Sequence, residues 1–350
     1  MLPITLLMKP QPIIEKYNVL TIGKLLFPIP CFLAPMSGVS DLPFRIINRS
    51  FGAPFAFTEM IDVKALSSLD KRTRHMLSSN PGDRPLGIQL LASDSKNILK
   101  ALKALESIEY DLLDFNAACP TPKVVRKGKG ASLLKEPHKL KEILKLLVDH
   151  APVPVTVKIR SGWDSDSVNA REIALYSEDA GISALFIHGR TKTQGYSGTV
   201  DYETIKKVKD ALKIPVIASG DNLNVPRIKK MFDITGCDGI AIARGSFGYP
   251  WIFHDLIRFF EDGSMGEEPG VNARVEVMKN HLNLLVQHYG EQRGLGIFHK
   301  FFIWYTKGIG KTRILRDRAF RTERLDEILA LIDEFKTLEK NKISQATRHQ

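Results

Sequence analysis

The chain has 350 residues, of which 43% are hydrophobic and 25% charged, so it can bury a sizeable core and is not a disordered protein. Its 50 Lys and Arg residues outnumber its 39 Asp and Glu residues, and the net charge of +11 favours a polyanionic partner without proving one. The three cysteines are far apart, and no apolar run reaches the ~18 residues of a membrane span, so we expect a cytoplasmic protein with no disulfides, no metal site and no membrane partner.

Short apolar runs alternate with longer segments of helical period in the first three quarters of the chain. The runs are nearly continuous in apolar character, as is typical of strands that are buried on both faces of a parallel sheet. They cover residues 32–36, 53–60, 85–91, 112–116, 153–160, 184–188, 215–219 and 239–244. The clearest helical segments between them cover residues 93–105, 136–149, 169–180 and 202–212.

This alternation predicts an α/β fold in which residues 1–260 form a (β/α)8 TIM barrel. An open doubly wound sheet is the alternative, but it has fewer strands as a rule, and no GxGxxG motif follows the first run. Residues 261–270 are acidic and rich in Gly and Pro, so we expect a linker there. Residues 271–340 show only helical periods, which predict a second domain, a small all-α bundle of three to five helices.

The active site of a TIM barrel lies at the C-terminal ends of its strands. Lys158 and Arg160 alternate near the end of the fifth run and therefore share one face. Cations there call for an anionic or electron-rich ligand, or for a salt bridge to Glu59 or Asp221. The seventh and eighth runs end in Ser-Gly-Asp and Ala-Arg-Gly, where this fold often binds phosphate.

Cys119 is the most informative single residue. It follows the fourth run in a polar loop that also carries Lys123, Arg126 and Lys127, whereas Cys31 and Cys237 have apolar neighbours. A buried structural cysteine is the ordinary alternative. At the catalytic end of a barrel, however, a thiol can donate a proton or act as a nucleophile.

Several segments together resemble the tRNA-dihydrouridine synthase family. They are APMSGVSDLPFR from residue 34, FNAACPTPKVVRKGKGASLL from 115, VTVKIRSGW from 155, IHGRTKTQGYSG from 187, IASGD from 217, AIARGSFGYPWIF from 241 and HKFFIWYTKGIG from 299. The likeness spans roughly residues 20 to 320, and the ordered set is highly specific.

The resemblance implies FMN at the barrel mouth, reduced by NADPH or NADH, and tRNA as the substrate. Hydride would pass from the flavin to C6 of a uracil, and Cys119 would give a proton to C5. Asn116 would orient the uracil or the flavin. The residues implied in binding FMN are Pro35, Met36, Gln89, Lys158, His188, Ser219, Gly220, Asp221, Ala243, Arg244 and Gly245.

A tRNA partner also requires a basic surface. Residues 293–324 carry nine Lys and Arg against one Asp and one Glu, which makes this the densest basic stretch. A solvated helix face is the alternative, and for Trp304 and Tyr305 we favour core packing of at least one. The residues that we expect to contact tRNA, besides Asn116, are Lys123, Arg126, Arg190, Lys300, Lys307, Arg313 and Arg316.

Two other functions remain open at this stage. One is an FMN-dependent barrel that reduces a small enone or pyrimidine, which would need neither the basic C-terminal region nor a cysteine beside a lysine-rich loop. The other is a catalytically inactive barrel that only binds RNA. We expect a monomer.

Overall fold

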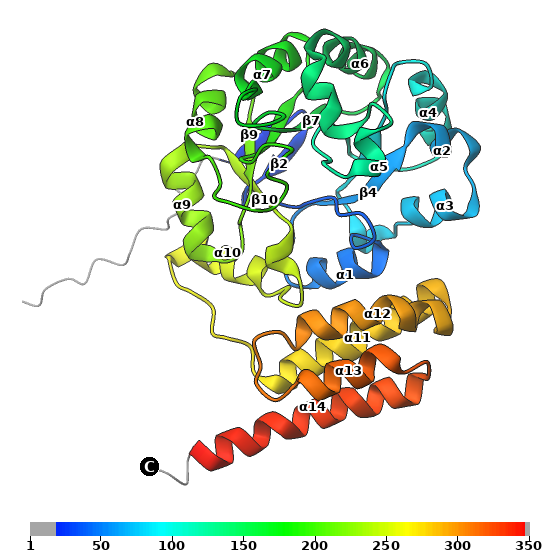
Figure 1. Cartoon of the computed structure of the whole chain (residues 1–350), viewed down its shortest axis with the longest axis vertical. Coiled ribbons are helices and arrows are strands. Elements are labelled where there is room, and N and C mark those ends of the chain that lie inside the picture. The colour runs from blue at the N-terminus through cyan, green and yellow to red at the C-terminus, as the bar shows by residue number, and fades with distance from the viewer. Residues whose placement is uncertain (1–18, 347–350) are drawn as a thin grey trace, which may run out of the picture.

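The computed structural model describes residues 19–346. Eight parallel strands form a closed barrel in the order β10-β3-β4-β5-β6-β7-β8-β9, which confirms the predicted TIM barrel (Figure 1). The strands are β3 (Cys31–Leu33), β4 (Ala56–Asp62), β5 (Leu86–Leu91), β6 (Leu112–Asn116), β7 (Val155–Arg160), β8 (Ala184–His188), β9 (Val216–Ser219) and β10 (Gly239–Ile242).

Helices surround the barrel on its outside (Figure 1). The four clearest helical segments of the sequence form α4, α6, α7 and α8. The α-helices of the barrel are α1 (Leu42–Ser50), α2 (Val63–Ser68), α3 (Lys71–Leu77), α4 (Ile98–Leu105), α5 (Pro122–Val125), α6 (Pro137–His150), α7 (Ala170–Asp179), α8 (Tyr202–Ala211), α9 (Val225–Thr235) and α10 (Ile252–Asp262). Within the described residues, three short 3-10 helices, η2 (Pro81–Asp83), η3 (Gly130–Lys135) and η4 (Arg244–Ser246), complete the connections.

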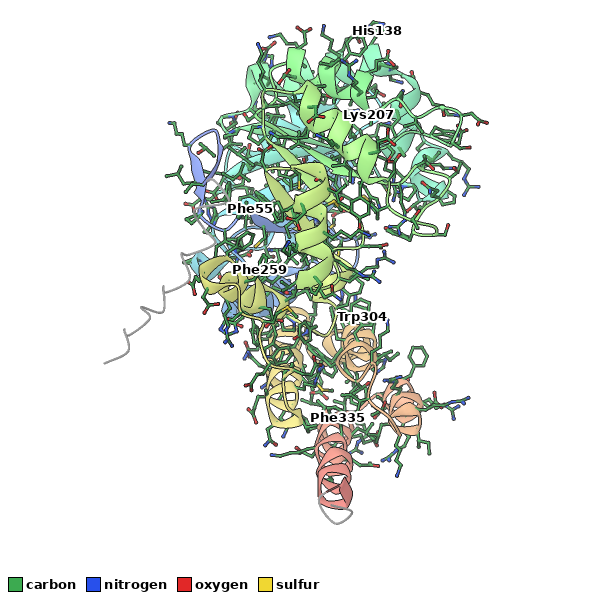
Figure 2. The ribbon with its side chains drawn as sticks, turned by 90° about the vertical axis from the view of Figure 1, so that its left-hand side faces the viewer. Phe55, His138, Lys207, Phe259, Trp304 and Phe335 are labelled. Atoms are coloured by element: carbon green, nitrogen blue, oxygen red, sulfur yellow. The ribbon has the colours of Figure 1, made fainter. Side chains whose placement is uncertain are left out.

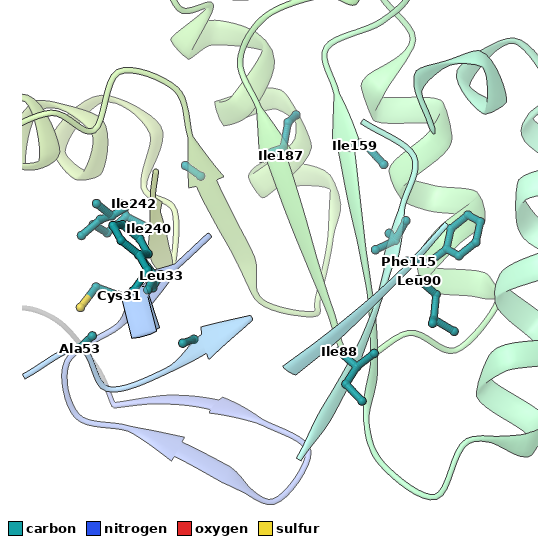
Figure 3. Close-up of a cluster of buried hydrophobic side chains, with 14 of the residues drawn as sticks. Cys31, Leu33, Ala53, Ile88, Leu90, Phe115, Ile159, Ile187, Ile240 and Ile242 are labelled. Carbon is teal, nitrogen blue, oxygen red and sulfur yellow. The ribbon is translucent and has the colours of Figure 1, made fainter. Parts of the chain in front are cut away.

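Successive side chains of a strand point to opposite faces, and this alternation divides the core in two. The outward side chains pack against the helices, and Figure 3 shows those of β3 beside Ile240 and Ile242 of β10. Inward side chains such as Phe32, Phe57 and Phe186 fill the N-terminal part of the barrel. The remaining space inside the barrel lies toward the C-terminal ends of the strands.

An antiparallel hairpin that the sequence pattern did not reveal precedes the barrel. It consists of β1 (Leu20–Ile22) and β2 (Leu25–Phe27). Phe27 packs against Phe32 and Phe55, with ring centroids 4.8 and 5.6 Å away. The hairpin therefore joins the inner apolar cluster at the end of the barrel opposite the catalytic end.

The C-terminal region is helical, as predicted, and packs against one side of the barrel (Figure 1). It contains α11 (Val271–Tyr289), α12 (Glu291–Tyr305), α13 (Arg313–Arg321) and α14 (Leu325–Ala346). Trp304 of α12 lies at the boundary with the barrel, whereas Phe335 of α14 lies farther away (Figure 2). None of the described helices combines the length and the apolar character that a membrane crossing requires.

Candidate active site

A cavity of about 420 Å³ lies at the C-terminal ends of the barrel strands. Residues from most of the strand ends that we singled out in the sequence meet in its wall. The predicted residues that line it are Pro35, Met36, Gln89, Asn116, Cys119, Lys158, His188, Ser219, Gly220, Asp221, Ala243 and Arg244.

A buried hydrogen-bond chain connects three neighbouring strands below this cavity. Asn116 Nδ2 donates to Gln89 Oε1 at 2.8 Å, and Gln89 Nε2 donates to Asp114 Oδ2 at 2.7 Å. Thr156 Oγ1 donates to the other oxygen of Asp114 at 2.6 Å. Burial raises the pKa of Asp114 to about 6, although both hydrogen bonds oppose that shift. These hydrogen bonds fix the side chains of Gln89 and Asn116 before any ligand binds.

Asn116 also holds the loop of residues 117–121, which connects β6 to α5 and carries Cys119; we call it the cysteine loop. Its Oδ1 accepts the backbone N–H groups of Ala118, at 3.0 Å, and Cys119, at 2.8 Å. Two N–H donors fix which end of the amide is the oxygen, so the orientation of Asn116 follows from its partners. With both ends of its amide bonded within the protein, Asn116 positions Cys119 directly.

Cys119 is half-buried in the cavity wall, and its Sγ donates to Thr121 Oγ1 at 3.3 Å. Its carbonyl accepts the N–H of Ala131 at 3.0 Å. Gly130 has a φ of +58°, and a Cβ there would lie 2.7 Å from the Cys119 carbonyl oxygen, so only glycine fits beside the loop. The other two cysteines are buried, and burial raises the pKa of Cys237 to about 11.

Lys158 forms neither of the salt bridges that we considered as alternatives. Its Nζ donates to Ser219 Oγ at 3.0 Å, and Ser219 Oγ donates in turn to the Ile187 carbonyl at 3.1 Å. Burial lowers the pKa of Lys158 to about 8, which the charge of Asp114 opposes and that of Arg160 reinforces. The ammonium group thus faces the cavity with a neutral hydroxyl as its hydrogen-bond partner.

His188 has a buried Nε2 atom with no hydrogen-bond partner among the residues that the structure describes. Burial is the main cause that lowers its pKa well below the ordinary value, and Arg160 and Lys158 add to the effect. The imidazole is therefore neutral at pH 7. A buried polar atom without a partner is costly, so this nitrogen indicates that a ligand group supplies the missing partner.

The turn after β9 concentrates charge at one end of the cavity. Asp221 pairs with Arg190 at 2.5 Å and with Arg244 at 2.8 Å, and the hydrogen bond from Arg190 is the main cause that lowers the pKa of Asp221. Two guanidinium groups against one carboxylate leave a positive excess there. Gly220 has a φ of +122°, which favours glycine.

The comparisons with known proteins identify the family of this chain. The family model described as "Dihydrouridine synthase (Dus)" matches residues 32–342. The chain belongs to the dihydrouridine synthase family. It is 38% identical to tRNA-dihydrouridine synthase B of Pasteurella multocida over 86% of this chain and 91% of that protein. It is also 34% identical to tRNA-dihydrouridine synthase B of Pseudomonas aeruginosa, over 91% and 96% respectively.

A solved structure supports the barrel of this dihydrouridine synthase. The 6-hydroxypseudooxynicotine amine oxidase of Pseudomonas geniculata superposes with a TM-score of 0.57 at 13% identity, over 77% of this chain and 53% of that one. At this identity, the likeness concerns the fold alone.

Some predicted residues lie outside the cavity wall. Gly245 packs closely within the protein. A Cβ at this position would lie only 2.3 Å from the Asn222 carbonyl oxygen. Arg190 is buried and, besides pairing with Asp221, donates to the carbonyls of Ser197 and Gly198. Its guanidinium group therefore already has its hydrogen-bond partners within the protein.

The basic residues that we expected to contact tRNA divide into two groups. Lys123 and Arg126 are exposed beyond the cysteine loop, and Lys307 and Arg313 are exposed on the helical region. By contrast, Arg316 Nε donates to Thr306 Oγ1 at 2.9 Å, so this side chain ties α13 to the end of α12. Lys300 lies beside a second cavity, between the barrel and α12.

Our site prediction omitted several residues that shape the cavity at the C-terminal ends of the strands. Asp114 interrupts the apolar run of β6 two positions before Asn116, and this spacing was the signal that could have revealed it. The guanidinium groups of Arg160 and Arg244 lie 5.7 and 5.1 Å from the ring centroid of Tyr196. Phe247 lies in the segment from residue 241 that resembles the family, but its place in the wall depends on the path of the loop after β10.

Proposed function

We propose that this chain reduces the C5–C6 double bond of specific uridines in tRNA, with FMN as the hydride donor and Cys119 as the proton donor. The observation that carries this proposal is that one cavity joins a half-buried thiol to a buried, unpaired imidazole and a lysine. Such a set suits a redox-active ring and a substrate that needs an acid.

The residues present fit FMN. Lys158, Gln89 and the unpaired Nε2 of His188 would contact the polar atoms of the flavin ring. The turn at Gly220 and the positive excess at Arg244 would hold the phosphate. Bound FMN, once reduced by NADPH or NADH, supplies a hydride for C6 of uracil. We include Ser219 and Ala243 in the wall that encloses it.

The protein itself supplies the proton. Negative charge develops toward O4 of the uracil as C6 gains hydride, and C5 then needs an acid. The Sγ–H of Cys119 gives that proton, and the bonds from Asn116 and Ala131 hold its backbone in place. The guanidinium of Arg160 interacts electrostatically with Cys119 and offers a positive charge to the sulfur that has lost its proton.

The substrate side of the proposal rests on exposed cations. A uridine must leave its stack to reach a cavity inside a barrel, so the tRNA has to be gripped on both sides of the site. Lys123 and Arg126 lie on the cysteine-loop side, and Lys307 and Arg313 lie on the helical region. We propose that these four contact phosphates, and that the enzyme acts as a monomer in the cytoplasm.

A comparison of possible substrates tests this function. The purified, reduced protein is offered tRNA from a strain that lacks dihydrouridine, or small enones and free uracil, and oxidation of the flavin is followed. We expect oxidation by tRNA together with dihydrouridine in the product. Oxidation only by the small molecules would instead favour a small-molecule reductase, and purified protein without a flavin absorbance band would favour an inactive RNA-binding barrel.

A further inference from the structure

Helix α12 reaches the loop that forms one wall of the catalytic cavity. Lys300 Nζ donates to the carbonyl oxygen of Gly38, in the loop between β3 and α1. The neighbouring residues Met36, Ser37 and Val39 line the cavity. A side chain of the helical region therefore bonds directly to the backbone of the catalytic barrel.

The same glycine is held from the barrel side as well. The N–H of Gly38 donates to Oε1 of Glu59, the central residue of β4. Within the loop, the N–H groups of Val39 and Ser40 both donate to the Met36 carbonyl at 3.0 Å. Gly38 has a φ of +72° in this tight turn. One peptide segment is thus fixed between a carboxylate of the barrel and an ammonium of α12.

The surroundings of Lys300 suit this role better than contact with a phosphate. Its side chain borders a cavity of about 330 Å³ between the barrel and α12, and Asp41 and Glu59 border the same cavity. Burial lowers the pKa of Lys300, while the charges of Asp41 and Glu59 raise it. Two carboxylates thus attract this ammonium, and its Nζ already donates to the Gly38 carbonyl, although Arg72 and Arg293 border the same cavity.

Trp304 supplies a second contact from α12. It lies four residues after Lys300, so both are on one face of the helix. Its ring stacks on Phe247, with centroids 4.0 Å apart and planes at 9°. Phe247 lines the catalytic cavity. The same helix face therefore touches two loops of the cavity wall, after β3 and after β10.

We propose that Lys300 is a positioning residue: it sets the loop of residues 36–40, and so couples the docking of α12 to the shape of the catalytic cavity. The link to catalysis rests on the proposed function, whereas the link to the loop does not. The mechanism requires that the loop loosen when the ammonium is removed, and that tRNA affinity stay the same.

Hydrogen–deuterium exchange tests the loop directly, in Lys300→Met and Lys300→Arg against the parent. A lost hydrogen bond to a charged group should speed exchange of the amides at residues 36–41 roughly tenfold in Lys300→Met, and less in Lys300→Arg. Lys307→Met removes an equal charge from an exposed position of the helical region, and it should leave the exchange rates of these amides unchanged. Unchanged exchange in Lys300→Met would overturn the proposal.

Kinetics on tRNA separate the two possible roles of Lys300. We expect turnover of Lys300→Met to fall roughly tenfold, with an unaltered salt dependence of tRNA binding and partial rescue in Lys300→Arg. A weaker, less salt-dependent binding with normal loop exchange would make Lys300 a phosphate contact. If Lys300→Met does not fold, Glu59→Ala must loosen the same amides. If the parent protein does not reduce uridines in tRNA, the proposed function is refuted. Hydrogen–deuterium exchange of the loop amides still decides the role of Lys300 in that case.

Discussion

The buried polar side chains of the cavity are arranged for a ligand. Lys158 has a hydroxyl as its hydrogen-bond partner, and His188 leaves Nε2 unpaired among the described residues. A barrel core without a ligand would be more stable with apolar groups at these positions. These two residues thus reduce the stability of the flavin-free protein, and a bound flavin offsets that cost.

Lys158 should make the stability of the flavin-free protein depend on pH. Its pKa is about 8 in the folded protein and 10.5 ordinarily, so between these values the unfolded chain holds a proton that the folded protein has lost. The stability of the parent relative to Lys158→Met therefore rises with pH across that interval and is constant below it. Urea unfolding at pH 7, 8.5 and 10 measures this difference, and a constant difference would refute it.

At the scale of elements, the strands were predictable and the loops between them were not. The apolar runs of β5 to β8 are buried on both faces, so composition alone revealed them. The hairpin β1–β2 has only three residues in each strand, too few for a periodic signal. Likewise, α2 and α3 are single short helices whose burial depends on their neighbours.

The site was predictable only to the extent that strand ends define it. The twelve predicted residues in the cavity wall stand within two residues of a strand end or just beyond one, where the barrel fixes their direction. By contrast, we expected the basic residues Arg190, Lys300 and Arg316 to contact tRNA. Their bonds to Asp221, Gly38 and Thr306 depend on how distant segments meet, which no local pattern contains.

The support that Gly130 gives to the cysteine loop can be tested with a matched glycine. Gly130→Ala forces a Cβ against the Cys119 carbonyl, so we expect a loss of about 1–3 kcal/mol and a clear loss of turnover. Gly236→Ala has a similar φ of +63° and nothing within 4 Å, so it should cost stability without affecting turnover. Thermal unfolding and flavin oxidation by tRNA measure the two effects, and equal turnover in both variants would contradict this role.

At the scale of the whole molecule, charge and shape point to a substrate that spans both regions. The net charge is +11, and exposed cations lie on the cysteine-loop side and on α12–α13. Because α12 contacts the barrel through Lys300 and Trp304, the two regions present a fixed surface. A rigid RNA that bridges them would deliver one base to the cavity.

Charge reversal on the helical region should weaken tRNA binding in a salt-dependent way. We expect Lys307→Glu with Arg313→Glu to weaken tRNA binding and to lower the slope of log affinity against log salt by about 2. Arg316 is unsuitable for this test, because it ties α13 to α12. The control is Lys206→Glu with Lys207→Glu on α8, which should bind as the parent does. Equal slopes in both double variants would remove Lys307 and Arg313 from the interface.

The central claim is that the Cys119 thiol protonates a uracil next to a flavin, and one variant tests it most directly. Cys119→Ala should bind FMN and tRNA as the parent does, because the loop is held by backbone bonds. Dihydrouridine formation on its own tRNA, measured by mass spectrometry of digested nucleosides, should fall by about 100-fold or more. A rate close to that of the parent would show that another group supplies the proton and would contradict the account.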